Sequence, residues 1–233
     1  MPNDSDNQGH ESAARKIADL LRTIVNPMSE HTRIGYCHMG ATLSDTILQA
    51  GLNYRTVVLP RVKQILASYP HAETTTKFWK VLSDVGPDKV LQWSHPEKIG
   101  RLMSLTRLLC EKHLETEREL AAWLWSANAA SELRAIKGIG PKTVDYLKLL
   151  VGIPIVAVDR HVRSLFQLAG LQMHRYDEIR SVLCMAADVL GVEPQVLDAV
   201  VWEYFSSRPE RGRRGKTGIN GPRKSGEACV ARA

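Results

Sequence analysis

Apolar residues recur every three to four positions through most of residues 10–207, which is the spacing of one face of an α-helix. Prolines near the starts of these patterns and glycines just past their ends are typical of helix boundaries. Alternation with a period of two, as in a half-buried strand, is nearly absent. We therefore predict an all-α fold, with helices that include residues 17–25, 54–66, 99–109, 120–124, 129–136, 146–150, 162–168, 179–190 and 200–204.

Three segments do not follow the helical period. Residues 153–158 are apolar and rich in β-branched side chains, but they number only six. We predict a buried connector there, with a short strand as the alternative. Residues 1–9 are polar, and residues 208–233 combine glycines with many charges. Neither end can bury enough apolar surface to offset its ordering entropy, so both are predicted to be disordered.

The net charge of +6 is concentrated at one end of the chain. Residues 208–233 carry eight basic and two acidic side chains, so residues 1–207 are formally neutral. A basic tail of this kind is suited to non-specific contact with the phosphates of a nucleic acid. A nucleic-acid interface elsewhere must therefore arise from the local arrangement of a few residues.

Several function classes are disfavoured by composition. No apolar run reaches the 18 residues of a membrane span, and residues 1–9 lack the apolar core of a signal peptide. The cysteines, at positions 37, 110, 184 and 229, are too far apart for a C-x-x-C zinc site or a compact iron–sulfur motif. We expect a cytoplasmic protein without a metal or organic cofactor, associated with the nucleoid in a bacterium or archaeon.

Residues 136–144, with the sequence IKGIGPKTV, carry the clearest motif. Gly138 and Gly140 permit a tight turn, and Pro141 is suited to the first position of a helix. The backbone N–H groups of Gly138, Gly140 and Lys142 are expected to point outward at the helix N-terminus, where they can bind phosphate. With the helix before it, this segment predicts a helix–hairpin–helix at about residues 129–150, which grips a DNA strand through its backbone.

A second segment lies downstream, GIPIVAVDRHV at residues 152–162. In it, Asp159 follows the apolar connector 17 residues after Lys142. Hairpin, helix, connector and V-D-x-H-V together resemble the HhH-GPD superfamily of DNA glycosylases, in particular its endonuclease III-like branch. The specific resemblance covers about residues 131–169. The chain departs from that branch in having Lys137 before the hairpin, a slightly shorter connector and no iron–sulfur cysteines.

The resemblance implies a two-lobed helical fold with DNA in the cleft between the lobes. Residues 10–40 would pack with C-terminal helices in residues 161–207, and residues 41–160 would form a helical barrel lobe. The implied function is base-excision repair by a monomer acting on double-stranded DNA with a damaged, mismatched or abasic nucleotide. Lys142 is the implied nucleophile of glycosylase and abasic-site lyase chemistry, and Asp159 the catalytic carboxylate. The expected DNA contacts are Gly138, Ile139, Gly140, Thr143, Gln49 and His161.

Alternatives remain open at this point. The chain could be a non-catalytic helix–hairpin–helix DNA-binding protein, or a monofunctional glycosylase in which Asp159 activates water and Lys142 contacts phosphate. Asp159 also suits the N-cap of the helix that follows it. His161 suits a structural or phosphate-facing role better than acid–base chemistry. Asn53, Tyr54 and Arg55 are candidates for the mouth of the site, and Trp93, Trp123 and Trp125 for aromatic residues of the pocket or of the core. The excised base is not identified.

Overall fold

The computed structural model describes residues 4–24 and 35–207, and within them every regular element is helical. The prediction of an all-α fold is confirmed. Part of the predicted 10–40 region (residues 25–34) and the predicted basic tail 208–233 lie outside the described residues. The helices are α1 (Asp4–Ile24), α2 (Met39–Leu48), the short π-helical segment η1 (Tyr54–Val58), α3 (Leu59–Ser68), α4 (Thr75–Val85), α5 (Pro87–Leu91), α6 (Pro96–Glu111), α7 (Glu117–Leu124), α8 (Ala129–Ala135), α9 (Pro141–Leu150), α10 (Arg160–Leu168), α11 (Tyr176–Leu190) and α12 (Pro194–Ser206).

The N-terminal prediction of disorder through residue 9 is wrong for residues 4–9. Helix α1 begins at Asp4 and continues without a break into the apolar stripe that includes Ile17 and Leu21. Once a helix has nucleated on a packed stripe, each further residue adds one backbone hydrogen bond at little cost. The polar residues 4–9 therefore continue the helix that forms on the packed apolar residues.

The single helix predicted at residues 54–66 is divided in two. Val58 N–H donates to the carbonyl of Asn53, five residues back, and α3 begins only at Leu59. Pro60 has no N–H to donate to the carbonyl four residues before it, so the α-helical pattern cannot run unbroken through this point. The chain instead forms the π-helical turn η1 before α3 begins.

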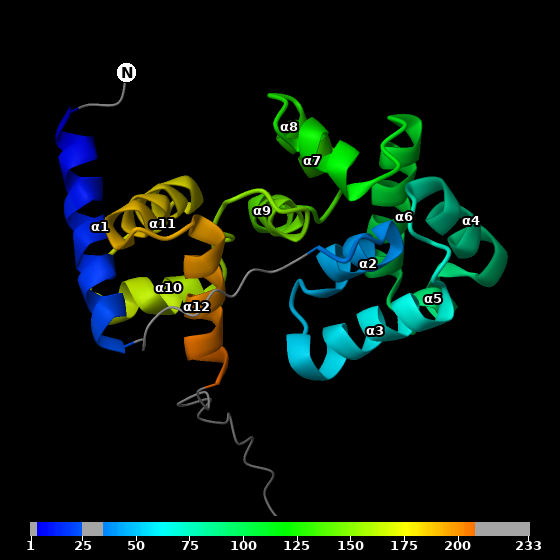
Figure 1. Cartoon of the computed structure of the whole chain (residues 1–233), viewed down its shortest axis with the longest axis horizontal. Coiled ribbons are helices and arrows are strands. Elements are labelled where there is room, and N and C mark those ends of the chain that lie inside the picture. Colours follow the sequence, from blue (N-terminus) through cyan, green and yellow to red (C-terminus); the bar gives the residue numbers. More distant parts are fainter. Residues whose placement is uncertain (1–3, 25–34, 208–233) are drawn as a thin grey trace, which may run out of the picture.

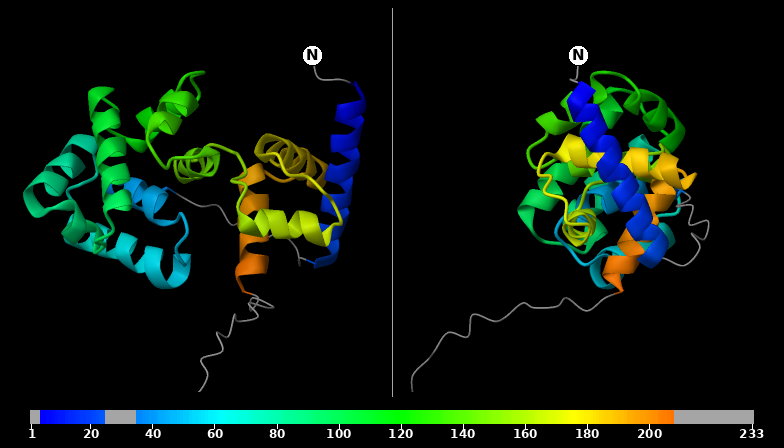
Figure 2. Two further views of the ribbon diagram at one scale, coloured as in Figure 1. Left: turned by 180° about the vertical axis from the view of Figure 1, so that it is seen from behind. Right: turned by 90° about the vertical axis from the view of Figure 1, so that its left-hand side faces the viewer.

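Buried hydrophobic residues form two main clusters. The first cluster runs from Met39 in α2 to Ile153 just after α9, and the second combines α1 with residues 156–201. Figure 1 shows α1, α10, α11 and α12 on one side, α2 to α8 on the other, and α9 between them; the view from behind in Figure 2 shows the same division. The first and last helices therefore pack together although they are far apart in sequence.

Helix α9 is joined to both sides through buried carboxylates. Asp45 of α2 accepts hydrogen bonds from the hydroxyls of Tyr146 in α9 (3.1 Å) and Tyr36 (2.6 Å). Asp145 of α9 accepts from the Tyr176 hydroxyl (2.9 Å) and the Arg180 guanidinium (3.0 Å) of α11. Buried carboxylates require such partners because desolvation of an unpaired charge is costly. These bonds set the position of α9, which carries Lys142.

The segment predicted as a buried connector has no regular secondary structure in residues 153–158. Its residues Ile153, Val156 and Val158 are buried, the first in the first cluster and the other two in the second. The connector interpretation is confirmed over the strand alternative. The chain passes here from one cluster to the other and delivers Asp159 to the start of α10.

Candidate functional site

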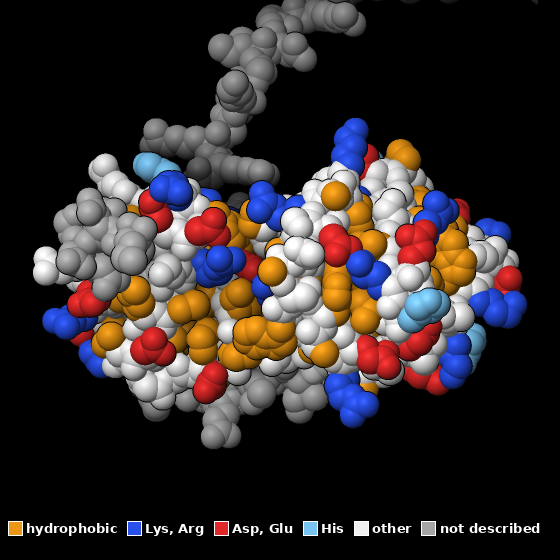
Figure 3. Space-filling view, turned by 90° about the horizontal axis from the view of Figure 1, so that it is seen from above, with side chains coloured by type: hydrophobic (Ala, Val, Ile, Leu, Met, Phe, Trp, Pro, Cys, Tyr) orange, Lys and Arg blue, Asp and Glu red, His pale blue; other side chains and the backbone are white. Residues whose placement is uncertain are grey.

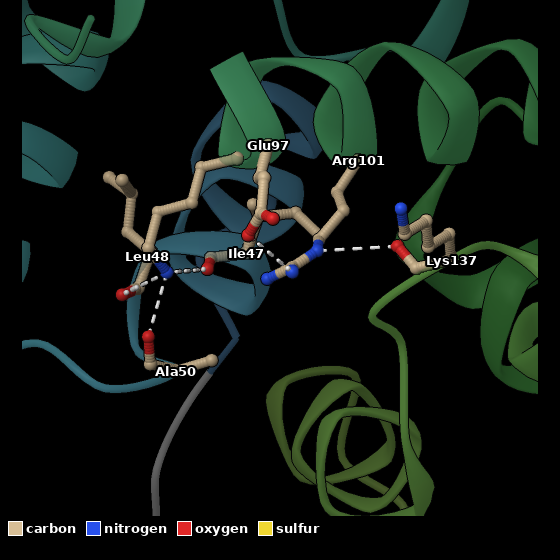
Figure 4. A network of polar contacts seen from close by, with 7 residues as sticks. Ile47, Leu48, Ala50, Glu97, Arg101 and Lys137 are labelled. Atoms are coloured by element: carbon tan, nitrogen blue, oxygen red, sulfur yellow. Dashed lines mark hydrogen bonds and ion pairs between the residues drawn. The ribbon is translucent and has the colours of Figure 1, made fainter. Parts of the chain in front are cut away.

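The predicted hairpin lies between α8 and α9. Gly138 has φ +88°, a conformation that residues with a side chain rarely adopt. A Cβ on Gly138 would lie 2.0 Å from Nε of Arg101, which donates a hydrogen bond to the carbonyl of Lys137 (3.3 Å). Helix α6 thus supports the outside of the turn through Arg101 (Figure 4). Glycine is required at position 138 by both the backbone conformation and this close approach.

Three amides of the hairpin remain available to a ligand. Among the residues that the structure describes, the N–H groups of Gly138, Gly140 and Lys142 have no hydrogen-bond acceptor. All three lie at or just before the first turn of α9, where the helix dipole also favours an anion. This arrangement is suited to a phosphate group of a nucleic-acid strand.

Two hairpin residues predicted to contact DNA are turned inward. The side chains of Ile139 and Thr143 are only 5% and 7% exposed, and Ile139 belongs to the first cluster. Their N–H groups are also used, donating to the carbonyls of Ile136 and Gly140. The period of α9 and the turn before it direct these two positions into the core. An interface here would use the backbone of neighbouring residues instead.

A change at the hairpin glycines tests this geometry. We expect Gly138→Ala to lower the free energy of unfolding by about 1–3 kcal/mol, because the residue must leave its positive φ and displace Arg101. The affinity for duplex DNA should fall with it. Denaturant unfolding and a DNA titration measure both effects.

Gly140→Ala is the matched control. Gly140 has φ −105°, and a Cβ there would meet nothing within 4 Å. Its effect on the free energy of unfolding should stay below about 1 kcal/mol. Equal destabilisation by both changes would contradict the described geometry.

A cavity of about 510 Å³ opens where the two clusters meet. Its lining comes from the segment after α2, from η1, from the first turns of α9 and α10, and from α12. Four of the predicted site residues line it: Gln49, Lys142, Asp159 and His161. Asn53, Tyr54 and Arg55 line it as well. The volume is in the usual range for a pocket that binds a small organic group.

Lys142 projects into this cavity from α9. Its Nζ donates a hydrogen bond to Oε1 of Gln49 at 2.8 Å. Burial lowers the pKa of Lys142, while the charges of Asp159 and Asp198 act in the opposite direction and that of Arg160 lowers it further. The net direction is downward, so a larger fraction of the amine is neutral than in an exposed lysine. A neutral amine is the nucleophilic form.

Asp159 combines two roles that its position allows. As the N-cap of α10 it accepts hydrogen bonds from the N–H groups of His161 (2.7 Å) and Val162 (3.0 Å), both at Oδ1. The same side chain lines the cavity and acts electrostatically on Lys142. Capping therefore fixes the position of a carboxylate that lines the same cavity as the Lys142 amine.

Gln49 lies at the C-terminal end of α2, and the backbone on both sides of it is fixed by Lys98. It follows α2, is 8% exposed, and its Nε2 has no hydrogen-bond partner among the described residues. On both sides of it, carbonyls of Ile47, Leu48 and Ala50 accept hydrogen bonds from Nζ of Lys98 at 2.8, 3.3 and 2.7 Å. Figure 4 shows these bonds beside those of Arg101. Helix α6 therefore supports both the α2 end and the hairpin.

The buried lysine of α6 gives a prediction about pH. Burial, with smaller effects of Arg101 and Lys142, lowers the pKa of Lys98 to about 8 from an ordinary 10.5. Between these values the unfolded chain binds more protons than the folded one, so stability rises with pH across that window. Relative to Lys98→Met, the free energy of unfolding of the unmodified protein should increase by up to about 3 kcal/mol from pH 8 to pH 10.5. Denaturant unfolding of both proteins across this range measures the difference, and a constant difference would contradict the prediction.

Two aromatic residues that line the cavity, Trp202 and Phe205, were not selected from the sequence, whereas Tyr54 was. Trp202 of α12 meets Tyr54 edge-to-face at 5.7 Å, and Arg55 lies over its ring at 5.3 Å. Phe205 stacks on His161 with centroids 6.3 Å apart. The tryptophans proposed for the pocket lie elsewhere: Trp93 and Trp123 pack at the edge of the first cluster, and Trp125 is 71% exposed.

The spacing of residues within α12 could have indicated from the sequence that Trp202 and Phe205 lie on one face of that helix. Asp198, Trp202 and Phe205 stand at positions i, i+4 and i+7, which share one helix face. All three line the cavity.

Other features of the described residues bear on the function classes. No three His, Cys, Asp or Glu side chains come together there as metal ligands would, and no helix is long and apolar enough to cross a membrane. The face in Figure 3 mixes Lys and Arg with Asp and Glu, as expected from the neutral balance of residues 1–207. Charge of one sign therefore does not mark a binding surface on that face.

Comparisons with protein-family models, curated proteins and solved structures gave no match.

Proposed function

We propose that the protein is a base-excision repair DNA glycosylase with abasic-site lyase activity, acting as a monomer on double-stranded DNA. The observation that carries the proposal is the meeting of Lys142 and Asp159 in one cavity, beside three free amides of the hairpin. Two clusters with a cavity between them are also what the two-lobed HhH-GPD arrangement would provide. The sequence resemblance and the geometry thus support the same activity.

The cavity suits a nucleotide turned out of the duplex. An enzyme that acts at C1′ must bring the nucleotide out of the base stack into a pocket. A volume of about 510 Å³ accommodates a base and its sugar, and Trp202, Phe205 and Tyr54 supply aromatic surface. The amides of Gly138, Gly140 and Lys142 bind a nearby phosphate and so set the register of the strand.

The chemistry begins at the sugar. As the N-glycosidic bond breaks, its electron pair leaves with the base, which takes up a proton, and positive charge develops on the sugar. The Asp159 carboxylate stabilises this charge. The lone pair of neutral Lys142 Nζ forms a bond to C1′, and Asp159 takes a proton from the nitrogen.

The covalent intermediate then leads to strand cleavage. The sugar ring opens as O4′ gains a proton, which leaves a Schiff base between C1′ and Nζ. Loss of a proton from C2′ expels the 3′ phosphate with the electron pair of its C–O bond. Water finally hydrolyses the Schiff base and releases the Lys142 amine.

Borohydride trapping tests the proposal. The protein is mixed with duplexes that carry either an abasic site or one of a panel of damaged bases, with and without borohydride. We expect a covalent protein–DNA adduct with the abasic duplex and with at least one damaged duplex. Base release without any adduct would support the monofunctional alternative. Neither adduct nor base release on any duplex would leave only DNA binding and would refute the glycosylase proposal.

A further inference from the structure

The segment between α9 and α10 decides how Lys142 and Asp159 lie relative to each other. Lys142 is in the first turn of α9, and Asp159 is the N-cap of α10. Residues 151–158, which join the two helices, contain neither helix nor strand. An irregular segment has no repeating backbone hydrogen bonds that would fix the geometry of its two ends. Contacts from other elements must therefore hold it.

Side chains of the last two helices bind the end of this segment. The N–H of Ala157 donates to Oδ1 of Asp198 in α12 (3.0 Å), and the N–H of Val158 donates to the hydroxyl of Tyr176, the first residue of α11 (3.2 Å). Val158 is only 3% exposed, so its N–H requires an acceptor within the protein. Since Val158 directly precedes Asp159, the Tyr176 hydroxyl holds the backbone next to the proposed catalytic carboxylate.

The same hydroxyl is bonded to α9. It donates to Oδ2 of Asp145 at 2.9 Å, and Asp145 follows Lys142 by three residues, which is almost one helical turn. A hydroxyl can donate one hydrogen bond and accept others, so it can bind Val158 and Asp145 at the same time. We call these three residues, Asp145, Tyr176 and Val158, the Tyr176 bridge. It joins the neighbour of one proposed catalytic residue to the neighbour of the other.

The bridge is supported from α11. The Arg180 guanidinium donates to the same Oδ2 of Asp145 at 3.0 Å and lies over the Tyr176 ring, 5.9 Å from its centroid. Asp145 is 2% exposed, and a charge-assisted bond at a buried carboxylate keeps it in one orientation. Neither Asp145 nor Tyr176 lines the cavity. The bridge can therefore affect a reaction there only through the residues that it positions.

We propose that Tyr176 is a positioning residue, whose hydroxyl joins α9 to the segment before α10 and so fixes Asp159 relative to Lys142. The inference rests on the proposed glycosylase function and adds to it a residue outside the cavity. A displacement of reacting groups by about 1 Å can cost on the order of 10²-fold in rate. Loss of the bridge should therefore slow the chemical step and leave the hairpin, which contacts the DNA backbone, unchanged.

Tyr176→Phe tests the inference because it removes the hydroxyl and keeps the ring that packs beneath Arg180. The rate of borohydride adduct formation is measured in a single turnover on a duplex with an abasic site, at saturating protein. The affinity for the same duplex is measured without borohydride. We expect the rate to fall by at least about 10-fold and the affinity to stay within about two-fold.

A second measurement needs no DNA. Hydrogen exchange of the Val158 amide should become faster in Tyr176→Phe, since this amide has lost its acceptor. Exchange of the Ala157 amide, which is bonded to Asp198, serves as the internal reference. This readout reports on the bridge itself, whatever reaction the protein catalyses.

Thr75→Val is the control for stability. Thr75 is buried away from the cavity, and its hydroxyl donates to the carbonyl of Leu114 at 2.5 Å. Each of the two changes removes one hydroxyl bond to the protein interior, so each should lower the midpoint of thermal unfolding by about 2–4 °C. Thr75→Val should nevertheless keep the rate of adduct formation within about two-fold of the unmodified protein.

Three results would overturn the inference. The first is an unchanged rate of adduct formation in Tyr176→Phe. The second is an equal loss of rate in Thr75→Val, which would show that the rate follows stability. The third is unchanged exchange of the Val158 amide in Tyr176→Phe. Absence of an adduct with the unmodified protein would instead refute the proposed function, and the inference would fall with it; the adduct of the unmodified protein thus distinguishes the two failures.

Discussion

Lys142→Ala is expected to abolish the borohydride-trapped adduct on every duplex and to lower the rate of strand cleavage by about 10³-fold or more. The reason is that Lys142 is the only lysine among the described residues that line the cavity. Loss of a covalent nucleophile removes a pathway and not merely a contact, so effects of this size are typical. Gel analysis of reduced protein–DNA adducts measures the outcome.

The control for this change lies on the same helix. Lys148 is half-buried in the last turn of α9 and does not line the cavity, so Lys148→Ala should leave adduct formation within about two-fold of the unmodified protein. Adducts that persist in Lys142→Ala would assign the Schiff base to another amine. Base release that persists without an adduct would show that Lys142 serves only to hold the DNA.

Asp159→Asn is expected to lower base release by about 10²-fold or more with little change in stability. Asparagine caps a helix about as well as aspartate, so the bonds from His161 and Val162 can be kept. The charge that stabilises the sugar cation is lost, and one electrostatic contribution of this kind accounts for about 10²- to 10³-fold. Rates of base release and denaturant unfolding separate the two roles.

Two further variants complete this comparison. Asp159→Ala should add a loss of about 1 kcal/mol in the free energy of unfolding, since the cap of α10 is then gone. Thr116→Ala removes the capping box of α7 away from the cavity and should cost a similar amount without a matching loss of base release. Full activity in Asp159→Asn, with a defect only in Asp159→Ala, would limit Asp159 to a capping role.

The sequence predicted helices best where one face is apolar and the other polar. Helix α2 was not predicted, because all ten of its residues are buried, including Thr42, Ser44 and Asp45. A helix buried on every side has no polar stripe, so its residues show no amphipathic period. Helix α4 was missed although its buried Phe78, Val81 and Leu82 lie at helical spacing, and α5, with five residues, is too short to show a period. The division between η1 and α3 depended on the missing N–H of Pro60, which hydrophobic period does not register.

The site was predictable where the motif is local. The turn at Gly138, the start of α9 at Pro141 and the N-cap at Asp159 are determined by neighbouring residues, and the structure places them as the local sequence indicates. The partners across the cavity depend on tertiary packing. The bond from Lys142 to Gln49 spans 93 positions and that from Ala157 to Asp198 spans 41. Neither pair has a sequence signature of its own.

The packing of α1 against α11 imposes an order on the making of the protein. Helix α1 is synthesised before α11, and most of its apolar stripe is covered only when residues 176–190 have been synthesised. The first cluster can assemble once residue 153 has emerged, while the cavity still lacks the side chains of α12. Because chains are made from the N-terminus, the nascent protein can hold a formed hairpin before it holds a complete site. The cavity is therefore completed later than the hairpin.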